Sequence, residues 1–399
     1  MNTPSKPLAG VKVLELGTLI AGPFCTRILA EFGAEVIKVE SPDGGDPLRQ
    51  WRKLHEGTSL WWSVQARNKK SITANLKHPE GLAVVRRLAE AADIVVENFR
   101  PGVLDKLGLG WDALSAANPG LVMVRLSGFG QTGPYRERPG FGAIGESMGG
   151  LRYITGFPDR PPVRTGISIG DSIAALWAAI GALMALRHRE VNGGAGQVVD
   201  VALYEAVFAM MESMVPEFDV AGFVRERTGN VMPGITPSNT HTTRDGRHII
   251  IGGNGDAIFR RLMQAIGRPD LADDPQLASN AGRDARAAEL YAAIDAWVAA
   301  RDGDAVLATM EAAEVPASAI YSVADMFRDA QFAARGMFEA ATLPDGTPMH
   351  IPGIVPKLEG TPGRTEWLGP KLGEHTDEIL AGLGLAPAEI AALREKGAI

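Results

Sequence analysis

The first forty residues contain a strand, a helix and a second strand in close succession. Val11–Leu16 has strand character, Ala21-Gly-Pro opens a helix that Gly33 ends, and Glu35–Val39 has strand character again. Pro23 suits a first helical turn, because its fixed backbone angle is compatible with a helix start and its missing N–H is not needed there. A strand–helix–strand unit of this length favours a right-handed crossover between parallel strands. The start of the chain therefore predicts a fold of the α/β class.

The same alternation continues further along the chain. A helix is predicted at Pro79–Ala91, and strands are predicted at Ser71–Asn75, Asp93–Glu97 and Leu121–Ser127. Strands that alternate with helices build a parallel sheet covered on both faces. A second α/β stretch begins at Arg247–Ile251, after a proline-containing linker at Thr228–Thr240.

Composition excludes several classes of protein. Apolar residues make up 45% of the 399 and charged residues 22%, which is typical of a soluble enzyme. The net charge of −7 argues against a broad nucleic-acid surface. Cys25 is the single cysteine, so no internal disulfide forms, and we expect it to be a small core residue.

Targeting and metal signals are missing from the sequence. The N-terminus has no apolar signal region, and the apolar run Ile173–Leu186 is shorter than the roughly 20 residues that span a bilayer. We therefore expect a cytoplasmic protein that binds no membrane. The seven histidines are scattered without metal-ligand spacing, so no metal site is predicted.

Asp171 stands between a glycine-flanked turn, Thr165-Gly-Ile-Ser-Ile-Gly, and the apolar run Ile173–Leu186. The run predicts a buried helix with Asp171 or Ser172 at its N-cap. Backbone N–H groups and the helix dipole favour an ionised carboxylate there. Such a group can cap a helix, bind a metal or attack an acyl carbon. From this segment alone, a structural cap is the simpler interpretation.

Two further segments allow both a structural and a functional interpretation. Gly252-Gly-Asn-Gly255 lacks the spacing of a dinucleotide-binding loop, and is either a tight turn or a flexible lid that excludes water. In Val96–Gly102, at a predicted strand end, Arg100 could meet a phosphate and Phe99 could cover an adenine ring. A surface loop with a buried Phe is the simpler alternative.

Arg67–Lys70 and Lys77 add positive charge nearby in sequence. A solvated face is the usual structure of such a run.

Eight segments considered together are more informative than any one alone. They are Pro7-Leu-Ala-Gly-Val-Lys-Val-Leu-Glu-Leu, Ala21-Gly-Pro, Gly33-Ala-Glu-Val-Ile-Lys-Val-Glu40, Asn68-Lys-Lys-Ser-Ile72, Val96-Glu-Asn-Phe-Arg-Pro-Gly102, Gly128-Phe-Gly-Gln-Thr-Gly-Pro134, Thr165-Gly-Ile-Ser-Ile-Gly-Asp171 and Leu372-Gly-Glu-His-Thr-Asp377. In this order the chain resembles the class III CoA-transferases, the CaiB/BaiF family that includes formyl-CoA transferase. The resemblance runs from about residue 7 to 395.

The resemblance implies an interlocked homodimer. A Rossmann-like, CoA-binding large domain would take residues 1–215 and 335–399, and a smaller α/β domain residues 228–330. The catalytic carboxylate is matched by Asp171, and the family's lid by Gly252, Gly253, Asn254 and Gly255. The family's CoA-contacting positions fall on Leu19, Ala21, Ala74, Lys77, Asn98, Phe99, Arg100, Val103, Lys106 and Phe141.

The chemistry implied by the resemblance is covalent transfer. Asp171 would attack the thioester of a donor acyl-CoA and carry CoA as an aspartyl thioester to an acceptor carboxylate. The CoA thioester is then a substrate, and no tightly bound cofactor is implied.

Departures from the family pattern bear on the substrate. Ser41 stands where formyl-CoA transferase has an arginine, and Ile20 stands where it has a glutamine, which weakens a role with oxalate or formate. Thr155–Asp159 and Leu19-Ile20 are similar to members that act on succinyl-CoA and small dicarboxylates such as glutarate, itaconate, mesaconate, malate or citramalate. The nearest candidates by sequence to hold a second carboxylate are Arg152, Arg164 and the backbone of the glycine-rich region 140–150.

Two alternatives stay open. An α-methylacyl-CoA racemase would need a histidine where the chain has Phe141, and Phe141 cannot exchange a proton. A non-catalytic CoA-binding module would explain the glycines and cations but gives Asp171 no role.

Overall fold

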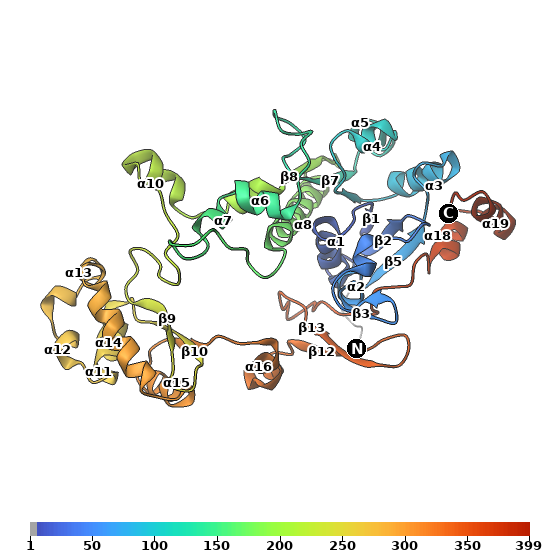
Figure 1. Cartoon of the computed structure of the whole chain (residues 1–399). Coiled ribbons are helices and arrows are strands. Elements are labelled where there is room, and N and C mark those ends of the chain that lie inside the picture. The colour runs from blue at the N-terminus through green and yellow to red at the C-terminus, as the bar shows by residue number, and fades with distance from the viewer. Residues whose placement is uncertain (1–5) are drawn as a thin grey trace. The chain divides into compact units, whose positions relative to one another are not determined.

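The computed structural model describes residues 6–399, and the chain divides into two compact units (Figure 1). Unit 1 takes the chain up to Leu151 together with Thr165–Phe223 and Gly336–Ile399. Unit 2 takes Arg152–Arg164 and Val224–Arg335. Unit 1 is therefore assembled from both ends of the sequence.

The centre of unit 1 is a parallel sheet with strand order β5-β2-β1-β6-β7-β8. Its strands are β1 (Lys12–Glu15), β2 (Glu35–Glu40), β5 (Lys69–Thr73), β6 (Ile94–Glu97), β7 (Val122–Ser127) and β8 (Val198–Ala202). All neighbours in this sheet pair in parallel, as the alternation of strands and helices predicts. The chain order reverses between β1 and β6, and ligands bind beyond the carboxyl ends of strands at such a point.

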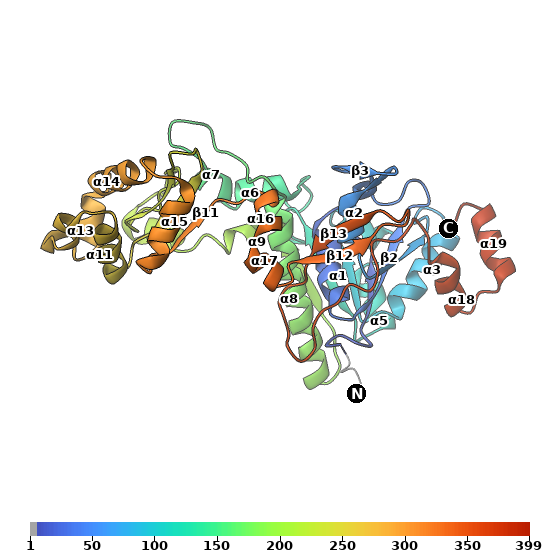
Figure 2. The same cartoon turned by 90° about the horizontal axis from the view of Figure 1, so that it is seen from below.

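Helices cover both faces of the sheet. Val13 and Val124 face α1 and α8, whereas Leu14 and Met123 face the other side, because successive strand residues point in opposite directions. Figure 2 shows α18 and α19 beside α3 on that second side. The helices are α1 (Ala21–Glu31), α8 (Ile169–Val191), α3 (Pro79–Glu90), α5 (Trp111–Ala117), α18 (Thr376–Gly382) and α19 (Pro387–Glu395).

Shorter elements complete unit 1. They are η1 (Pro47–Gln50), β3 (Leu54–His55), β4 (Thr58–Ser59), α2 (Leu60–Gln65), α4 (Val103–Lys106), α6 (Gly142–Met148), α9 (Leu203–Phe208), α10 (Met214–Ala221), β12 (Phe338–Thr342) and β13 (Pro348–Pro352). The helix α7 (Leu151–Ile154) lies where the chain passes from unit 1 to unit 2.

Unit 2 has its own hydrophobic core. Ile249 and Ile251 of an antiparallel sheet pack against Phe259, Leu290 and Ile294 of the helices. The strands are β9 (Ser238–Thr242), β10 (His248–Gly252) and β11 (Ala317–Ala319), in the order β11-β10-β9. The helices are α11 (Asp256–Ala265), α12 (Pro269–Ala272), η2 (Pro275–Leu277), α13 (Asn280–Ala285), α14 (Ala287–Ala299), α15 (Gly303–Ala312), α16 (Val323–Arg328) and α17 (Ala330–Ala334).

The helix α8 departs from the prediction in two ways. It begins at Ile169 with Ser168 as its N-cap, so the prediction of Asp171 or Ser172 at the N-cap is wrong. Asp171 lies inside the first turn. The early start is possible because Gly170 allows α8 to approach α6, where a Cβ would lie 2.7 Å from the Gly142 carbonyl oxygen.

The prediction that this helix is buried holds for only one of its faces. Alanines such as Ala174, Ala178 and Ala182 are buried, while Leu176 and Ile180 are 48% and 42% exposed. The 23 residues of α8 are long and apolar enough to cross a membrane by length and composition, as core helices of soluble proteins also are.

Candidate functional site

The carboxylate of Asp171 is held where α8 meets α6. It is half-buried in the first turn of α8, and a Cβ added to Gly142 would overlap it. The carboxylate therefore lies directly on the Gly142 backbone. Two glycines, Gly142 and Gly170, permit this close approach of the helices. The amino-terminal end of α8 favours negative charge at this position.

A cavity of about 210 Å³ opens at the carboxyl ends of β1, β2, β5 and β6. Three of the predicted CoA-contacting residues, Ala74, Lys77 and Phe99, line it. Lys77 is exposed and Phe99 is half-buried, so a cation and an aromatic ring are both accessible at its wall. The full lining is Leu16, Thr18, Lys38, Val39, Glu40, Ser41, Gly45, Asp46, Ala74, Asn75, Leu76, Lys77 and Phe99.

The other predicted CoA contacts, apart from Phe141, follow β1 and β6 in the chain, on loops or in the helical segments after them. Leu19 and Ala21 flank the start of α1, and Asn98, Arg100, Val103 and Lys106 follow β6, the last two in α4. Asn98 accepts a hydrogen bond from the Thr18 N–H at 2.8 Å, which joins the two loops. Phe141 instead precedes Gly142, is 66% exposed and lies at the start of α6.

The predicted lid belongs to unit 2, whereas Asp171 belongs to unit 1. Its loop is pinned within unit 2 by hydrogen bonds from the Gly253 N–H to the Pro237 carbonyl at 2.8 Å and from Arg283 to the Asn254 carbonyl at 2.7 Å. The Arg283 side chain is fully buried. Arg152 and Arg164, the predicted partners of a second carboxylate, also belong to unit 2.

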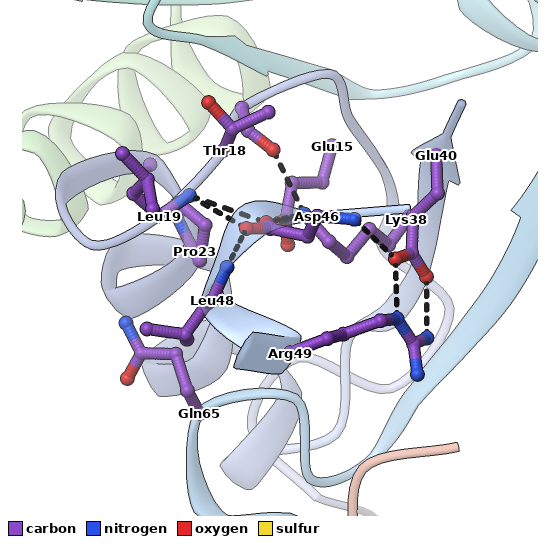
Figure 3. A network of polar contacts seen from close by, with 12 residues as sticks. Glu15, Thr18, Leu19, Pro23, Lys38, Glu40, Asp46, Leu48, Arg49 and Gln65 are labelled. Carbon is purple, nitrogen blue, oxygen red and sulfur yellow. Dashed lines mark hydrogen bonds and ion pairs between the residues drawn. The ribbon is translucent and has the colours of Figure 1, made fainter. Parts of the chain in front are cut away.

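An ionic network lies buried beside the cavity (Figure 3). Glu15 accepts hydrogen bonds from Lys38 at 2.7 Å and from Lys69 at 2.8 Å. Lys38 also pairs with Asp46 at 2.8 Å. All four side chains are 0–1% exposed.

This network corrects the prediction that Arg67–Lys70 form a solvated face. Arg67, Asn68 and Lys69 are buried, and only Lys70 is partly exposed. These residues are buried because they pair with residues distant in sequence. Lys69 donates a hydrogen bond to Glu15, and Arg67 donates one to Glu31 at 2.7 Å. Charged residues at inner positions of predicted strands, such as Glu15 and Lys38, were the available signal for such a network.

Burial and pairing shift the titration of these groups in opposite directions. Burial alone would raise the pKa of Glu15, but Lys38 and Lys69 outweigh it and hold that pKa at about 2. Burial, together with repulsion from Lys38, lowers the pKa of Lys69 to about 8 despite its pairing with Glu15. Lys38 pairs with both Glu15 and Asp46, which overcome its burial and raise its pKa.

Cys25 behaves as the sequence predicts. It is fully buried in the core between α1 and the sheet, and burial raises the pKa of its thiol to about 12. A thiol in this state is not a nucleophile at neutral pH. Among residues 6–399, no group of three or more His, Cys, Asp or Glu side chains is arranged to hold a metal ion.

Comparisons with known proteins agree in the family they indicate. The model of CoA-transferase family III matches residues 8–376. The chain is 53% identical to a succinyl-CoA–D-citramalate CoA-transferase and 43% identical to the beta subunit of a succinyl-CoA–L-malate CoA-transferase, both from Chloroflexus aurantiacus. These alignments cover 99% and 100% of this chain and 99% of each relative.

Solved structures agree with the sequence relatives. A CaiB/BaiF family protein from Brucella suis is 37% identical and superposes with a TM-score of 0.83. The superposition covers 95% of this chain and all of that one.

Proposed function

Because this chain belongs to CoA-transferase family III, we propose that it moves CoA from succinyl-CoA to a small dicarboxylate through a thioester on Asp171. The observation that carries the proposal is the Asp171 carboxylate, held half-buried on the Gly142 backbone in the first turn of α8. The substrate classes follow two relatives named for succinyl-CoA with D-citramalate or L-malate.

The reaction divides into four steps at one carboxylate. An Asp171 oxygen attacks the succinyl thioester carbonyl, which forms a mixed anhydride and releases CoA thiolate. The thiolate attacks the aspartyl carbonyl, giving aspartyl-CoA and free succinate. The acceptor carboxylate then attacks the aspartyl thioester, and the released thiolate attacks the acceptor acyl carbon. Asp171 is regenerated as a carboxylate, so no net proton transfer or external energy source is needed.

The nucleotide end of CoA is assigned to the cavity at the sheet edge. The strand order, numbered along the chain as 3-2-1-4-5-6, supports a Rossmann-like large domain with its ligand at the reversal point. Lys77 at the cavity wall and Arg100, which follows Phe99 in the sequence, would supply charge for phosphates, and Phe99 would supply a ring for the adenine. Closure by the Gly252–Gly255 loop would exclude water from the acyl intermediates.

A second copy of the chain is the proposed partner. Exposed apolar side chains recur every three or four residues along α8, which is the spacing of one helix face. They are Leu176, Trp177, Ile180, Leu183 and Met184. We expect a homodimer that cannot separate into folded monomers, and a reversible folded monomer in sedimentation at low concentration would contradict it.

The acceptor is tested by a screen of carboxylates with succinyl-CoA or acetyl-CoA as donor, read by mass spectrometry of the CoA products. We expect citramalate and malate to accept CoA and butyrate to be much poorer than succinate. A dicarboxylate leaves one free carboxylate that needs a cationic partner, for which Arg152 and Arg164 are proposed. Equal rates with butyrate and succinate would eliminate the dicarboxylate assignment, and no CoA transfer at all would eliminate the proposed function.

A further inference from the structure

Side chains from elsewhere in the fold hold four of the five residues in the loop between β1 and α1, namely Gly17, Thr18, Leu19 and Ile20. The Asn98 side chain makes two hydrogen bonds to the backbone of Thr18. It accepts one from the Thr18 N–H at 2.8 Å and donates one to the Thr18 carbonyl at 2.9 Å. The remaining bonds run from Lys38 to the Gly17 carbonyl at 2.8 Å, from the Leu19 N–H to Asp46, and from Gln65 to the Ile20 carbonyl at 3.1 Å. The backbone of this loop is therefore shaped from outside.

Leu19 is the strained residue of the loop. Its φ of 64° lies in the left-handed region, which a leucine adopts only where its surroundings impose it. Its N–H is shared between the two carboxylate oxygens of Asp46, at 3.1 and 3.2 Å. Asp46 thus offsets the strain of a leucine conformation that glycine would adopt readily.

Asp46 is itself fixed in direction. Its side chain is fully buried, pairs with Lys38 at 2.8 Å and accepts a hydrogen bond from the Leu48 N–H at 2.9 Å (Figure 3). Asp46, Lys38 and Thr18 also line the cavity at the sheet edge, together with Lys77. The loop and the cavity therefore share a wall whose shape depends on this carboxylate.

We propose that Asp46 is a positioning residue for CoA binding, which holds Leu19 in the left-handed conformation and so fixes the cavity wall. The inference rests on the proposed function, because it takes this cavity as the CoA site. Asp46→Asn keeps the side-chain shape but leaves one acceptor oxygen and removes the attraction to Lys38. Leu19 then relaxes to negative φ, and CoA binds more weakly although Asp46 need not touch it.

A double-mutant cycle separates this role from a general structural one. The dissociation constant of CoA is measured by calorimetry, and the KM values of succinyl-CoA and acceptor by steady-state kinetics. In the Leu19 enzyme, Asp46→Asn should weaken CoA binding about tenfold, the size expected of one strained backbone residue. In the Leu19→Gly background the same substitution should cost less than about twofold. Leu19→Ala is the matched control, because alanine keeps the strain and should show the full penalty.

An equal penalty in all three backgrounds, or none in the Leu19 enzyme, would overturn the proposal. If Asp46→Asn does not fold, Leu19→Pro replaces it, because proline enforces negative φ and lacks the N–H without altering the ion pairs. Unchanged CoA affinity in Leu19→Pro would also overturn it. CoA binding is measured without turnover, so a wild-type enzyme that binds CoA but transfers none would refute the proposed function alone.

Discussion

The Asp171 carboxylate rests on the backbone of Gly142, in the space that any side chain at residue 142 would need. Gly142→Ala should therefore displace the carboxylate and lower kcat by about 100-fold, the usual effect of a misplacement near 1 Å. Turnover is measured with succinyl-CoA, and folding by circular dichroism. Gly382→Ala is the matched control, since a Cβ at that helical glycine would meet no atom within 4 Å. Near-normal turnover in a folded Gly142→Ala enzyme would contradict the assigned position of Asp171.

Replacing Asp171 by Asn or Ala should abolish transfer and leave the fold intact. The group lies in the first helical turn, where loss of a favourable charge costs less than about 1 kcal/mol. Mass spectrometry of the wild-type enzyme after incubation with succinyl-CoA should detect an adduct of one CoA, and the variants should lack it. Asp112→Asn removes a first-turn carboxylate from α5 and should keep both adduct and turnover. Substantial transfer by Asp171→Ala would exclude the covalent route.

Lys77→Ala and Arg100→Ala should raise the KM for every acyl-CoA donor by similar factors and leave acceptor preference unchanged. Both cations are exposed, and Lys77 lines the cavity assigned to the nucleotide end of CoA. Charge-assisted contacts to phosphate are shared by all donors. The measurement is a donor series at saturating acceptor, with the exposed Lys357→Ala as control. A donor-selective effect would assign these residues to the acyl group instead.

Acid should destabilise the protein through Glu15 over a defined range. The pKa of Glu15 is about 2 in the folded protein and about 4.5 in the unfolded chain, so the unfolded chain takes up the proton first as the pH falls. The stability that Glu15 contributes is complete above pH 4.5 and is lost as pH falls from 4.5 towards 2. That loss is on the order of 3 kcal/mol.

Urea unfolding between pH 7 and pH 3 measures the first part of this loss, about 2 kcal/mol, as a fall in the free energy of unfolding. Glu15→Gln is the matched variant, because it cannot titrate. The variant should be less stable than the wild type at pH 7, because Lys69 loses the carboxylate of Glu15 as its ionic partner. It should also lose less stability on acidification. An identical pH dependence in both proteins would show that Glu15 does not carry the effect.

Local periodicity predicted the sheet of unit 1 well. Glu35–Val39 and Asp93–Glu97 were predicted as strands, and the structure has Glu35–Glu40 and Ile94–Glu97. These segments are buried on both faces, so their apolar runs are distinct from the amphipathic helices between them. The predicted start of α8 was three or four residues too late, because the true start depends on how closely α6 approaches at Gly142 and Gly170.

Pairing between distant residues was beyond such a prediction. Lys69 looks like part of a basic surface run, and only the fold brings it to Glu15, 54 positions earlier. The hydrogen bond from the Leu19 N–H to Asp46 could not be predicted either, because nothing in the sequence indicates that a leucine adopts a positive φ. Candidate residues such as Asp171 and Lys77 were found through family motifs, whereas the side chains that hold the β1–α1 loop carry no local motif.

The C-terminal part of the chain returns to unit 1, so unit 1 cannot be completed during synthesis until after unit 2 has been made. Leu380 of α18, which lies against β5, and Ile390 of α19 belong to the same hydrophobic cluster as Ile72 and Val85, which are made some 300 residues earlier. At ribosomal speeds of about 5–20 residues per second, this side of β5 and α3 lacks its cover for roughly 15 to 60 seconds. The nascent chain therefore presents an apolar surface to chaperones while unit 2 is translated, and loss of the last 24 residues would leave that surface exposed permanently.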